Sequence, residues 1–227
     1  LAYSRKLDLR NGECVREVTW ESPQKERIKF VFRRFVSLAE QHVAAFQMEV
    51  TPLTGAVEIE IESGISSRSS NMGAQHCTDG EKRLLDGECL RLITRTSQSD
   101  IPVAVHCVHR FSKDPDFELP VIERRRLVKR FRFLADEKQT FKMDKTVCYH
   151  TGRDKEFEEP EYPSGTADAR LVAEKGEECI RRNKEKSYEE MLEESARVWK
   201  DYWERMDVRI ESPNSMDQLG VRFALYH

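Results

Sequence analysis

Apolar and polar residues alternate along many short segments in the first two thirds of the chain. Within residues 28–33, Ile28, Phe30 and Phe32 alternate with basic residues, and within residues 57–61 the apolar residues alternate with glutamates. A period of two is typical of a strand that buries one face. No helical pattern separates one such segment from the next, so parallel βαβ units are not expected. The sequence therefore predicts a mainly β chain whose antiparallel strands form a sandwich or a barrel.

Two stretches are expected to interrupt the strands. Asn11-Gly12 lies between two short strand-like runs, and both residue types tolerate positive φ, so a two-residue hairpin turn is predicted. Residues 63–87 contain Gly, Ser and Asn and few apolar residues, which predicts a long loop. Strand patterns resume beyond this stretch and continue to about Thr151.

The pattern changes near residue 158, where Pro160, Pro163 and Gly165 interrupt the chain. Helical patterns follow these residues. We therefore divide the chain into three parts, a β-sandwich domain at 1–158, a helical linker with a short strand at 159–212, and the start of a further unit at 213–227.

Two helices are expected in the linker. Thr166 or Asp168 can cap the first helix, which runs to about Arg182. Ser187 and Glu190 have the spacing of a capping box, in which each side chain satisfies a free backbone N–H group at the start of a helix. This box predicts the start of the second helix.

The second predicted helix carries one continuous apolar stripe. Trp199 and Trp203 lie on it, four residues apart, and should stack along one face. Such a stripe is usually core or domain interface, although aromatic faces can also stack on sugar rings. Residues 206–212 then alternate like one more strand. The apolar run 217–227 follows, and no stop signal closes it as a helix.

Composition argues against several classes of protein. A net charge of −3 over 227 residues does not favour nucleic-acid binding, which depends on neutralising phosphates. No run of 18 apolar residues is present, so no membrane span is expected. The six cysteines form no C-x-x-C pair, and we expect reduced, mostly buried thiols in a cytoplasmic protein.

Candidate catalytic and metal-binding motifs are few. His106 and His109 should point to opposite faces of a strand, so they are not expected to share a metal ion. The basic run 123–133 contains aromatic residues, as nucleic-acid surfaces do. However, most of its arginines share one parity and its apolar residues the other, which indicates a solvated face above a core face. We expect no catalytic residue and no metal site within the chain.

Several segments, in collinear order, resemble one family. Residues 3–23 match its hairpin, and Arg34, Phe35 and Ser37, followed by His42, match an Arg-Phe-x-Ser motif with a later histidine. Residues 196–212 match its connector, with W-x-x-x-W at Trp199 and Trp203, and residues 217–227 match a Gln-x-x-x-Arg-Phe opening of its catalytic barrel. Together these segments resemble glycoside hydrolase family 65, the inverting α-glucoside phosphorylases.

The resemblance implies an antiparallel β-supersandwich of the galactose-mutarotase type, a two-helix linker and an (α/α)6 catalytic barrel that begins at 213–227. It implies that the sandwich is incomplete at its start and that the chain is an internal piece of a longer enzyme. That enzyme would convert a maltose-, trehalose- or kojibiose-like disaccharide and phosphate to β-glucose 1-phosphate and glucose. Phosphate is the co-substrate, no cofactor is implied, and family analogy favours a homodimer.

The resemblance also implies where the functional residues lie. The general acid and the phosphate-binding residues belong to the barrel, so the chain by itself is expected to be inactive. Tyr226 and His227 would be the residues nearest to the substrate. The residues expected at the domain interface are Trp199, Trp203, Arg222 and Phe223.

Three alternatives remain open. The chain could be the same domain of an α-glucoside hydrolase such as a trehalase, in which water replaces phosphate. It could be a free-standing carbohydrate-binding sandwich, which would need an exposed aromatic platform on its strands. It could also be a structural adaptor with no sugar chemistry in the full-length protein.

Overall fold

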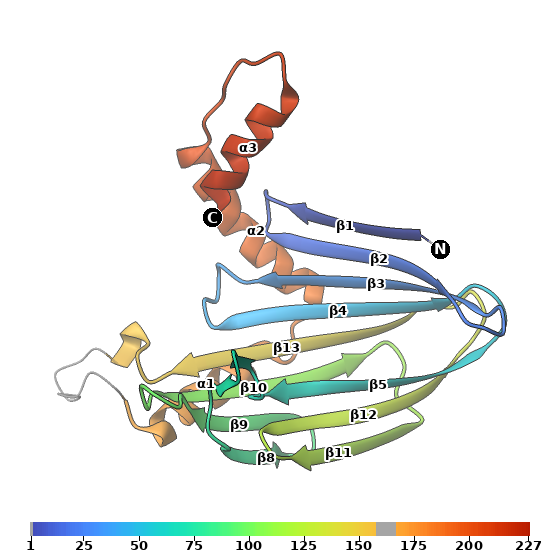
Figure 1. The fold of residues 1–227 in the computed structure, drawn as a ribbon, viewed down its shortest axis with the longest axis vertical. Helices are drawn as coiled ribbons and strands as arrows, with labels where there is room; N and C mark the ends of the chain where they lie inside the picture. The colour runs from blue at the N-terminus through green and yellow to red at the C-terminus, as the bar shows by residue number, and fades with distance from the viewer. Residues whose placement is uncertain (1, 158–166) are drawn as a thin grey trace.

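The computed structural model describes residues 2–157 and 167–227 and shows a mainly β molecule with three α-helices (Figure 1). All strand pairs are antiparallel, which confirms the predicted sheet type. The larger sheet, sheet A, has eight strands, in the order β1 (Ala2–Asp8), β2 (Glu13–Glu21), β3 (Arg27–Val36), β4 (Val43–Pro52), β13 (Phe141–Thr151), β10 (Pro102–Phe111), β9 (Cys89–Arg95) and β8 (Glu81–Leu85).

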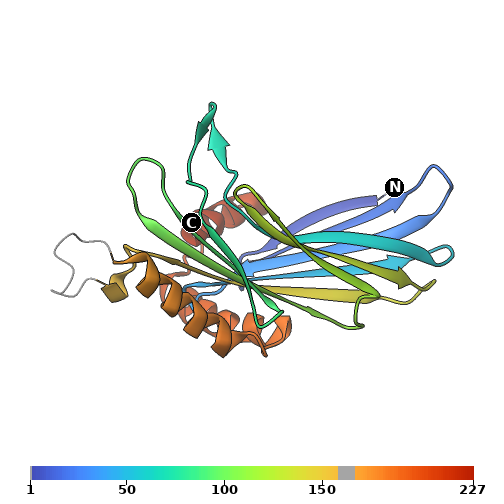
Figure 2. The same ribbon diagram turned by 90° about the horizontal axis from the view of Figure 1, so that it is seen from below.

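The smaller sheet, sheet B, contains β11 (Phe117–Glu123), β12 (Arg126–Ala135) and β5 (Val57–Ser66). It lies across the β13–β8 half of sheet A and also packs on β4 and the start of β3, whereas β1 and β2 extend beyond it (Figures 1 and 2). The core between the two sheets contains Phe131, Phe133, Phe141 and Met143, with further apolar residues packed beside them. The predicted sandwich is therefore present, with the β1–β2 end of sheet A left uncovered by sheet B.

The stretch predicted as a long loop, residues 63–87, is largely strand. β5 continues to Ser66 because Gly64 lets β12 come close: a Cβ there would lie 2.3 Å from the carbonyl oxygen of Leu127. A short hairpin of β6 (Ser70–Asn71) and β7 (Ala74–Gln75) then projects from the sheets (Figure 2), and β8 pairs with β9. The expectation failed because strand pairing, not apolar content, holds these residues.

The first hairpin turn also differs from the prediction. β1 and β2 are paired up to Asp8 and Glu13, so four residues, 9–12, form the connection. Gly12 has φ of +73° and its N–H donates to the carbonyl oxygen of Asp8 at 2.8 Å. Asn11 instead accepts a hydrogen bond from Glu13 N through its side chain, and its φ is not positive.

Helix α1 (Ala169–Asn183) follows a short 3-10 helix, η1 (Lys155–Phe157), and packs on the outer face of sheet A against β10 and β13. Asp168 caps it by accepting from Arg170 N at 2.7 Å, as predicted. Thr166, the other candidate cap, and the punctuating Pro160, Pro163 and Gly165 lie outside the described residues, as does the proposed boundary at 158. The buried residues of α1 recur three or four apart and form one stripe, comprising Val172, Ala173, Gly176, Cys179, Ile180 and Asn183.

Helix α2 (Tyr188–Met206) begins at the predicted capping box. Ser187 Oγ accepts from Glu190 N at 3.2 Å, and the Glu190 carboxylate accepts from Ser187 N at 2.8 Å. Its first turns pack on sheet A through Tyr188, whose ring meets that of Phe35 edge-on at 5.2 Å. Ser195 Oγ accepts from Leu38 N at 3.1 Å and ties the helix to the β3–β4 connection.

Residues 207–212 do not form the predicted strand. Within the described part of the chain no strand pairs with them, and the Gln218 side chain takes the place of a partner strand. Its Oε1 accepts from Ile210 N and its Nε2 donates to the carbonyl oxygen of Val208, both at 2.9 Å. Gln218 belongs to helix α3 (Ser215–Tyr226), which Asn214 caps. Among the described residues, no helix is both long and apolar enough to cross a membrane.

Candidate functional site

Three aromatic rings form a stack at the junction of α2 and α3. The ring centroids of Trp199 and Trp203 are 6.3 Å apart with an interplanar angle of 23°, so the two tryptophans share one face as predicted. Tyr226 stacks on Trp199 at 4.9 Å and 16°. The last turn of α3 is thereby fixed to the middle of α2.

The β1–β2 turn holds this stack against the sandwich. Trp203 Nε1 donates to the carbonyl oxygen of Leu9 at 2.8 Å. A Cβ at Gly12 would lie 2.8 Å from Trp199 Nε1 and 3.4 Å from the Tyr226 hydroxyl. Glycine is needed at position 12 both for its positive φ and for the space that the Trp199 ring fills.

A bidentate ion pair also joins the end of α2 to α3. Arg222 Nε and Nη2 donate to the two Asp207 carboxylate oxygens at 2.9 and 2.8 Å. The guanidinium holds the pKa of Asp207 below its usual range. Arg222, expected at a domain interface, therefore has a partner within the chain, which sequence spacing did not reveal.

Beside these contacts, an apolar face of α3 is left exposed among the described residues. No residue of this helix is buried, and Met216, Leu219 and Phe223 are 62%, 49% and 50% exposed. Their spacing of three and four places them on one side of the helix. His227 contacts Phe223 edge-on at 4.6 Å, at the end of this apolar face. We call Met216, Leu219 and Phe223 the α3 face.

A polar network at the start of α2 fixes the orientation of this helix on sheet A. Arg33 Nε donates to Glu13 at 2.8 Å, and its Nη1 donates to Gln47 at 2.8 Å and to Glu189 at 2.9 Å. The guanidinium also lies over the Tyr188 ring, 4.6 Å from its centroid. The network joins three strand residues to the first turn of a helix more than 140 positions away, so the position of α2 is set by the sandwich.

Burial affects the acids around this network. The Tyr188 hydroxyl donates to Glu13 at 3.0 Å, and burial raises the pKa of Tyr188. Burial also raises the pKa of Asp144, which accepts from Gln47 Nε2 at 2.9 Å. The alternation at residues 28–33 placed Arg33 on the polar face of a half-buried strand, and nothing in that pattern indicated this network.

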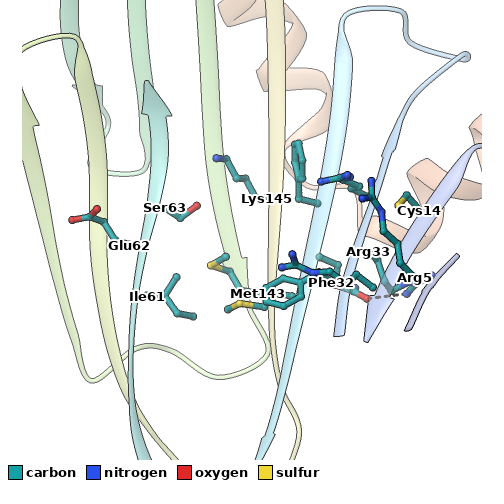
Figure 3. A pocket seen from close by; sticks show the side chains of 14 residues that line it. Arg5, Cys14, Phe32, Arg33, Ile61, Glu62, Ser63, Met143 and Lys145 are labelled. Atoms are coloured by element: carbon teal, nitrogen blue, oxygen red, sulfur yellow. Dashed lines mark hydrogen bonds between the residues drawn. The ribbon is translucent and has the colours of Figure 1, made fainter. Parts of the chain in front are cut away.

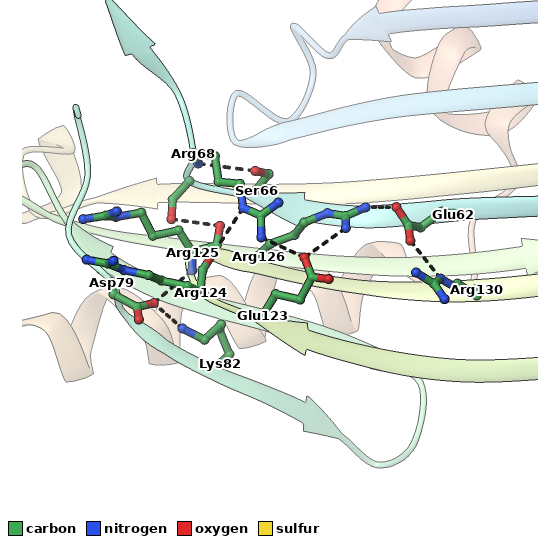
Figure 4. Close-up of polar contacts among 11 residues, drawn as sticks. Glu62, Ser66, Arg68, Asp79, Lys82, Glu123, Arg124, Arg125, Arg126 and Arg130 are labelled. Carbon is green, nitrogen blue, oxygen red and sulfur yellow. Dashed lines mark hydrogen bonds and ion pairs between the residues drawn. The ribbon is translucent and has the colours of Figure 1, made fainter. Parts of the chain in front are cut away.

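A cavity of about 410 Å³ lies on the inner face of sheet A beside β5 (Figure 3). Basic side chains dominate its polar lining, and they include Arg5, Arg16, Arg34 and Lys145. The single carboxylate among the lining residues, Glu62, forms ion pairs with Arg126 and Arg130 on sheet B (Figure 4). Among the described residues that line it, the cavity therefore offers no carboxylate that is free of an ion pair.

The two histidines singled out in the sequence do lie on opposite faces of β10. The His106 ring is buried against Gly176 of α1, where a Cβ would come within 2.4 Å of its Nδ1. His109 Nε2 is 2.9 Å from Ser63 Oγ, on the side of sheet B. The arginines of 126–132 lie above a buried Leu127, Phe131 and Phe133 and pair with glutamates of β5, as the alternation predicted.

Comparisons with known proteins agree with this architecture. The family model "Glycosyl hydrolase family 65, N-terminal domain" matches residues 1–202. The chain belongs to glycosyl hydrolase family 65. A kojibiose phosphorylase of Halothermothrix orenii is 35% identical over the whole chain, and an α,α-trehalose phosphorylase of Thermoanaerobacter brockii is 27% identical over the same extent.

A solved structure of a candidate kojibiose phosphorylase from the human microbiome shares the fold. It matches 99% of this chain with a TM-score of 0.83 at 16% identity, and this chain covers 28% of it. The chain likewise spans 29% of the length of each of the two phosphorylases named above. The family 65 chain described here thus corresponds to less than a third of its curated relatives.

Proposed function

We propose that the chain is the non-catalytic N-terminal part of an inverting α-glucoside phosphorylase. The observation that carries this proposal is the match, over the whole chain, to phosphorylases that act on kojibiose or trehalose. In the proposed reaction an acid protonates the glycosidic oxygen while phosphate attacks the anomeric carbon from the opposite face. The products are β-glucose 1-phosphate and glucose, and phosphate takes the place of the water used by inverting hydrolases.

We assign the general acid to a part of the enzyme outside these residues. The inner cavity supports this assignment because its one carboxylate is ion-paired with Arg126 and Arg130. Phosphate is proposed as co-substrate, with no further cofactor. A homodimer acting in the cytoplasm is the remaining part of the proposal, and the six unpaired thiols are compatible with a reducing compartment.

The α3 face is proposed as the contact with the catalytic domain. Met216, Leu219 and Phe223 expose apolar surface on a helix whose other side is fixed by the aromatic stack and by the Asp207–Arg222 pair. A helix held so firmly while its apolar side is open is suited to receive a second packing layer. In this arrangement Trp199 and Trp203 support the interface from beneath, and Tyr226 and His227 end the helix nearest to the substrate.

The test is an assay of the longer protein and of the 227-residue chain with kojibiose, trehalose and maltose, each with and without phosphate. The longer protein should release glucose 1-phosphate from at least one disaccharide only when phosphate is present, and the chain alone should release none. Glucose release without phosphate would favour the hydrolase alternative. Activity of the chain alone would contradict the placement of the general acid.

A further inference from the structure

Two histidines and a glutamate converge at the end of sheet A nearest to η1. His42 precedes β4, His150 belongs to β13 and Glu156 belongs to η1. One carboxylate oxygen of Glu156 lies 3.7 Å from His150 Nε2 and 4.0 Å from His42 Nε2. The two imidazole rings are stacked with their centroids 4.0 Å apart. Three side chains that can each offer a metal ligand therefore bring their ligand atoms within 4.8 Å of one another.

The hydrogen bonding of His42 leaves its Nε2, the nitrogen nearer to Glu156, free to bind a metal ion. His42 Nδ1 is 2.9 Å from the carbonyl oxygen of Tyr149, and a carbonyl can only accept, so Nδ1 carries the proton. The neutral ring then has its lone pair on Nε2, the atom that faces Glu156. A histidine that donates to a backbone carbonyl through one nitrogen and offers the other is the arrangement found around bound metal ions.

His150 brings an imidazole with no hydrogen-bonded partner into the same place. Its side chain is 4% exposed, and its Nδ1 is buried without a hydrogen-bond partner. Its Nε2, which faces Glu156, has no partner within hydrogen-bond distance among the described residues. A buried polar group without a partner costs free energy that a ligand at this nitrogen would offset.

We propose that His42, His150 and Glu156 form a binding site for a divalent transition-metal ion, with Zn²⁺ as the expected ion and water as a further ligand. Two imidazoles and one carboxylate are a ligand set typical of Zn²⁺, whereas Ca²⁺ and Mg²⁺ prefer oxygen ligands. A tetrahedral ion with bonds of about 2.1 Å needs ligand atoms about 3.4 Å apart, slightly closer than the distances seen here.

Binding requires a small closure of the site. Stacked rings direct their in-plane lone pairs side by side, so one ring must turn for both nitrogens to reach one ion. His42 and Glu156 can make this adjustment because their side chains are 33% and 37% exposed, whereas His150 is held by burial. The bound ion would join η1 to sheet A and would act in structure rather than in catalysis.

The test uses the full chain, freed of metal with a chelator and titrated with Zn²⁺ alone by calorimetry. One ion per chain should bind, and the Tm should rise with Zn²⁺ concentration. Glu156→Gln and His42→Gln change exposed side chains and should each weaken binding by at least tenfold. The matched controls, Glu178→Gln and His76→Gln, alter exposed residues elsewhere and should bind Zn²⁺ like the unchanged chain.

Substitution with Co²⁺ distinguishes this site from the cysteines. The proposal predicts weak visible bands without the strong thiolate-to-cobalt absorption in the near ultraviolet, and it predicts their loss in Glu156→Gln. Any of three results would overturn it: no stoichiometric binding, equal binding by the unchanged chain and Glu156→Gln, or a thiolate band. Circular dichroism of each variant checks that loss of binding is not loss of folding.

Discussion

Helices α1 and α3 are both capped at their first turn, yet they make opposite use of their apolar residues. α1 buries six residues against sheet A, whereas α3 buries none, although its composition is the more apolar. Capping residues thus start both helices, and the two differ in how their apolar residues pack. The exposed α3 face is the observation on which the proposed contact with a catalytic domain rests.

The largest expected difference between the two helices is in the cost of truncating an apolar side chain. Ile180→Ala in α1 should lower the free energy of unfolding by about 2–5 kcal/mol, since Ile180 is 5% exposed. Leu219→Ala in α3 should change it by less than about 0.5 kcal/mol. Urea unfolding of the 227-residue chain measures both. Equal losses of unfolding free energy for the two variants would contradict the difference between α1 and α3.

Lowering the pH should weaken the packing of α1 on sheet A and so reduce the stability of the chain. His106 lies beneath this helix, near Arg91 and His150, and burial lowers its pKa to about 4, against about 6.5 for an unfolded histidine. Between these values the unfolded chain binds a proton that the folded chain does not. The stabilisation is therefore complete above pH 6.5 and is lost as the pH falls towards 4.

The expected loss from His106 is up to roughly 3 kcal/mol, at about 1.4 kcal/mol for each pKa unit. His109, whose pKa burial lowers to about 3, adds a loss of the same sign. Unfolding measured at pH 7 and pH 4.5 should show a smaller difference for His106→Phe than for the unchanged chain. The exposed His76→Gln should leave the difference intact, and a pH profile unaffected by His106→Phe would refute this account.

The next largest effect on stability is expected from replacing one glycine in each helix with alanine. Gly176→Ala in α1 would place a methyl group 2.4 Å from the buried His106 ring and should destabilise the chain by about 1–3 kcal/mol. Gly220→Ala in α3 meets nothing within 4 Å and should stabilise it by about 0.5–1 kcal/mol through helix propensity. We expect Gly176→Ala to lower the Tm and Gly220→Ala to raise it. Changes of the same sign would contradict the difference between the packing of α1 and that of α3.

The smallest expected effect is that of the ion pair that fixes α3. Arg222→Ala removes both contacts to Asp207, but the two side chains are 40% and 22% exposed and solvent screens their attraction. A slight fall in Tm at low salt, absent at high salt, is the expected outcome. A large fall would mean that the pair, rather than the aromatic stack, holds α3.

Local patterns predicted the fold to the extent that local forces decide it. Alternation at 28–33, 57–61 and 126–133 identified real strands because each has a partner and a core to face. The same alternation at 207–212 was misleading, since no described strand pairs with it and Gln218 bonds its backbone at Val208 and Ile210 instead. Residues 63–87 were missed for the converse reason, because pairing with β9 and β12 forms strands there from weakly apolar sequence.

The junction of α2 and α3 could be predicted only where its contacts are local in sequence. The spacing of Trp199 and Trp203 along one helix is local, and their stacking followed from it. The bond from Trp203 to Leu9 and the contact of Arg33 with Glu189 join residues 194 and 156 positions apart. Such contacts are fixed by the tertiary fold, so no spacing in the sequence reveals them. The assignment of Trp199, Trp203, Arg222 and Phe223 to a domain interface remains a prediction, as does the assignment of Tyr226 and His227 to the neighbourhood of the substrate.

The most direct test of the α3 face as an interface compares the double variant Leu219→Ser and Phe223→Ser in the 227-residue chain and in the longer protein. The control is Tyr202→Ser, which alters a side chain of similar exposure on α2. We predict that the double variant leaves the unfolding of the chain nearly unchanged, but lowers the stability and phosphorolysis rate of the longer protein well beyond the control. Equally small effects in both proteins would contradict the account.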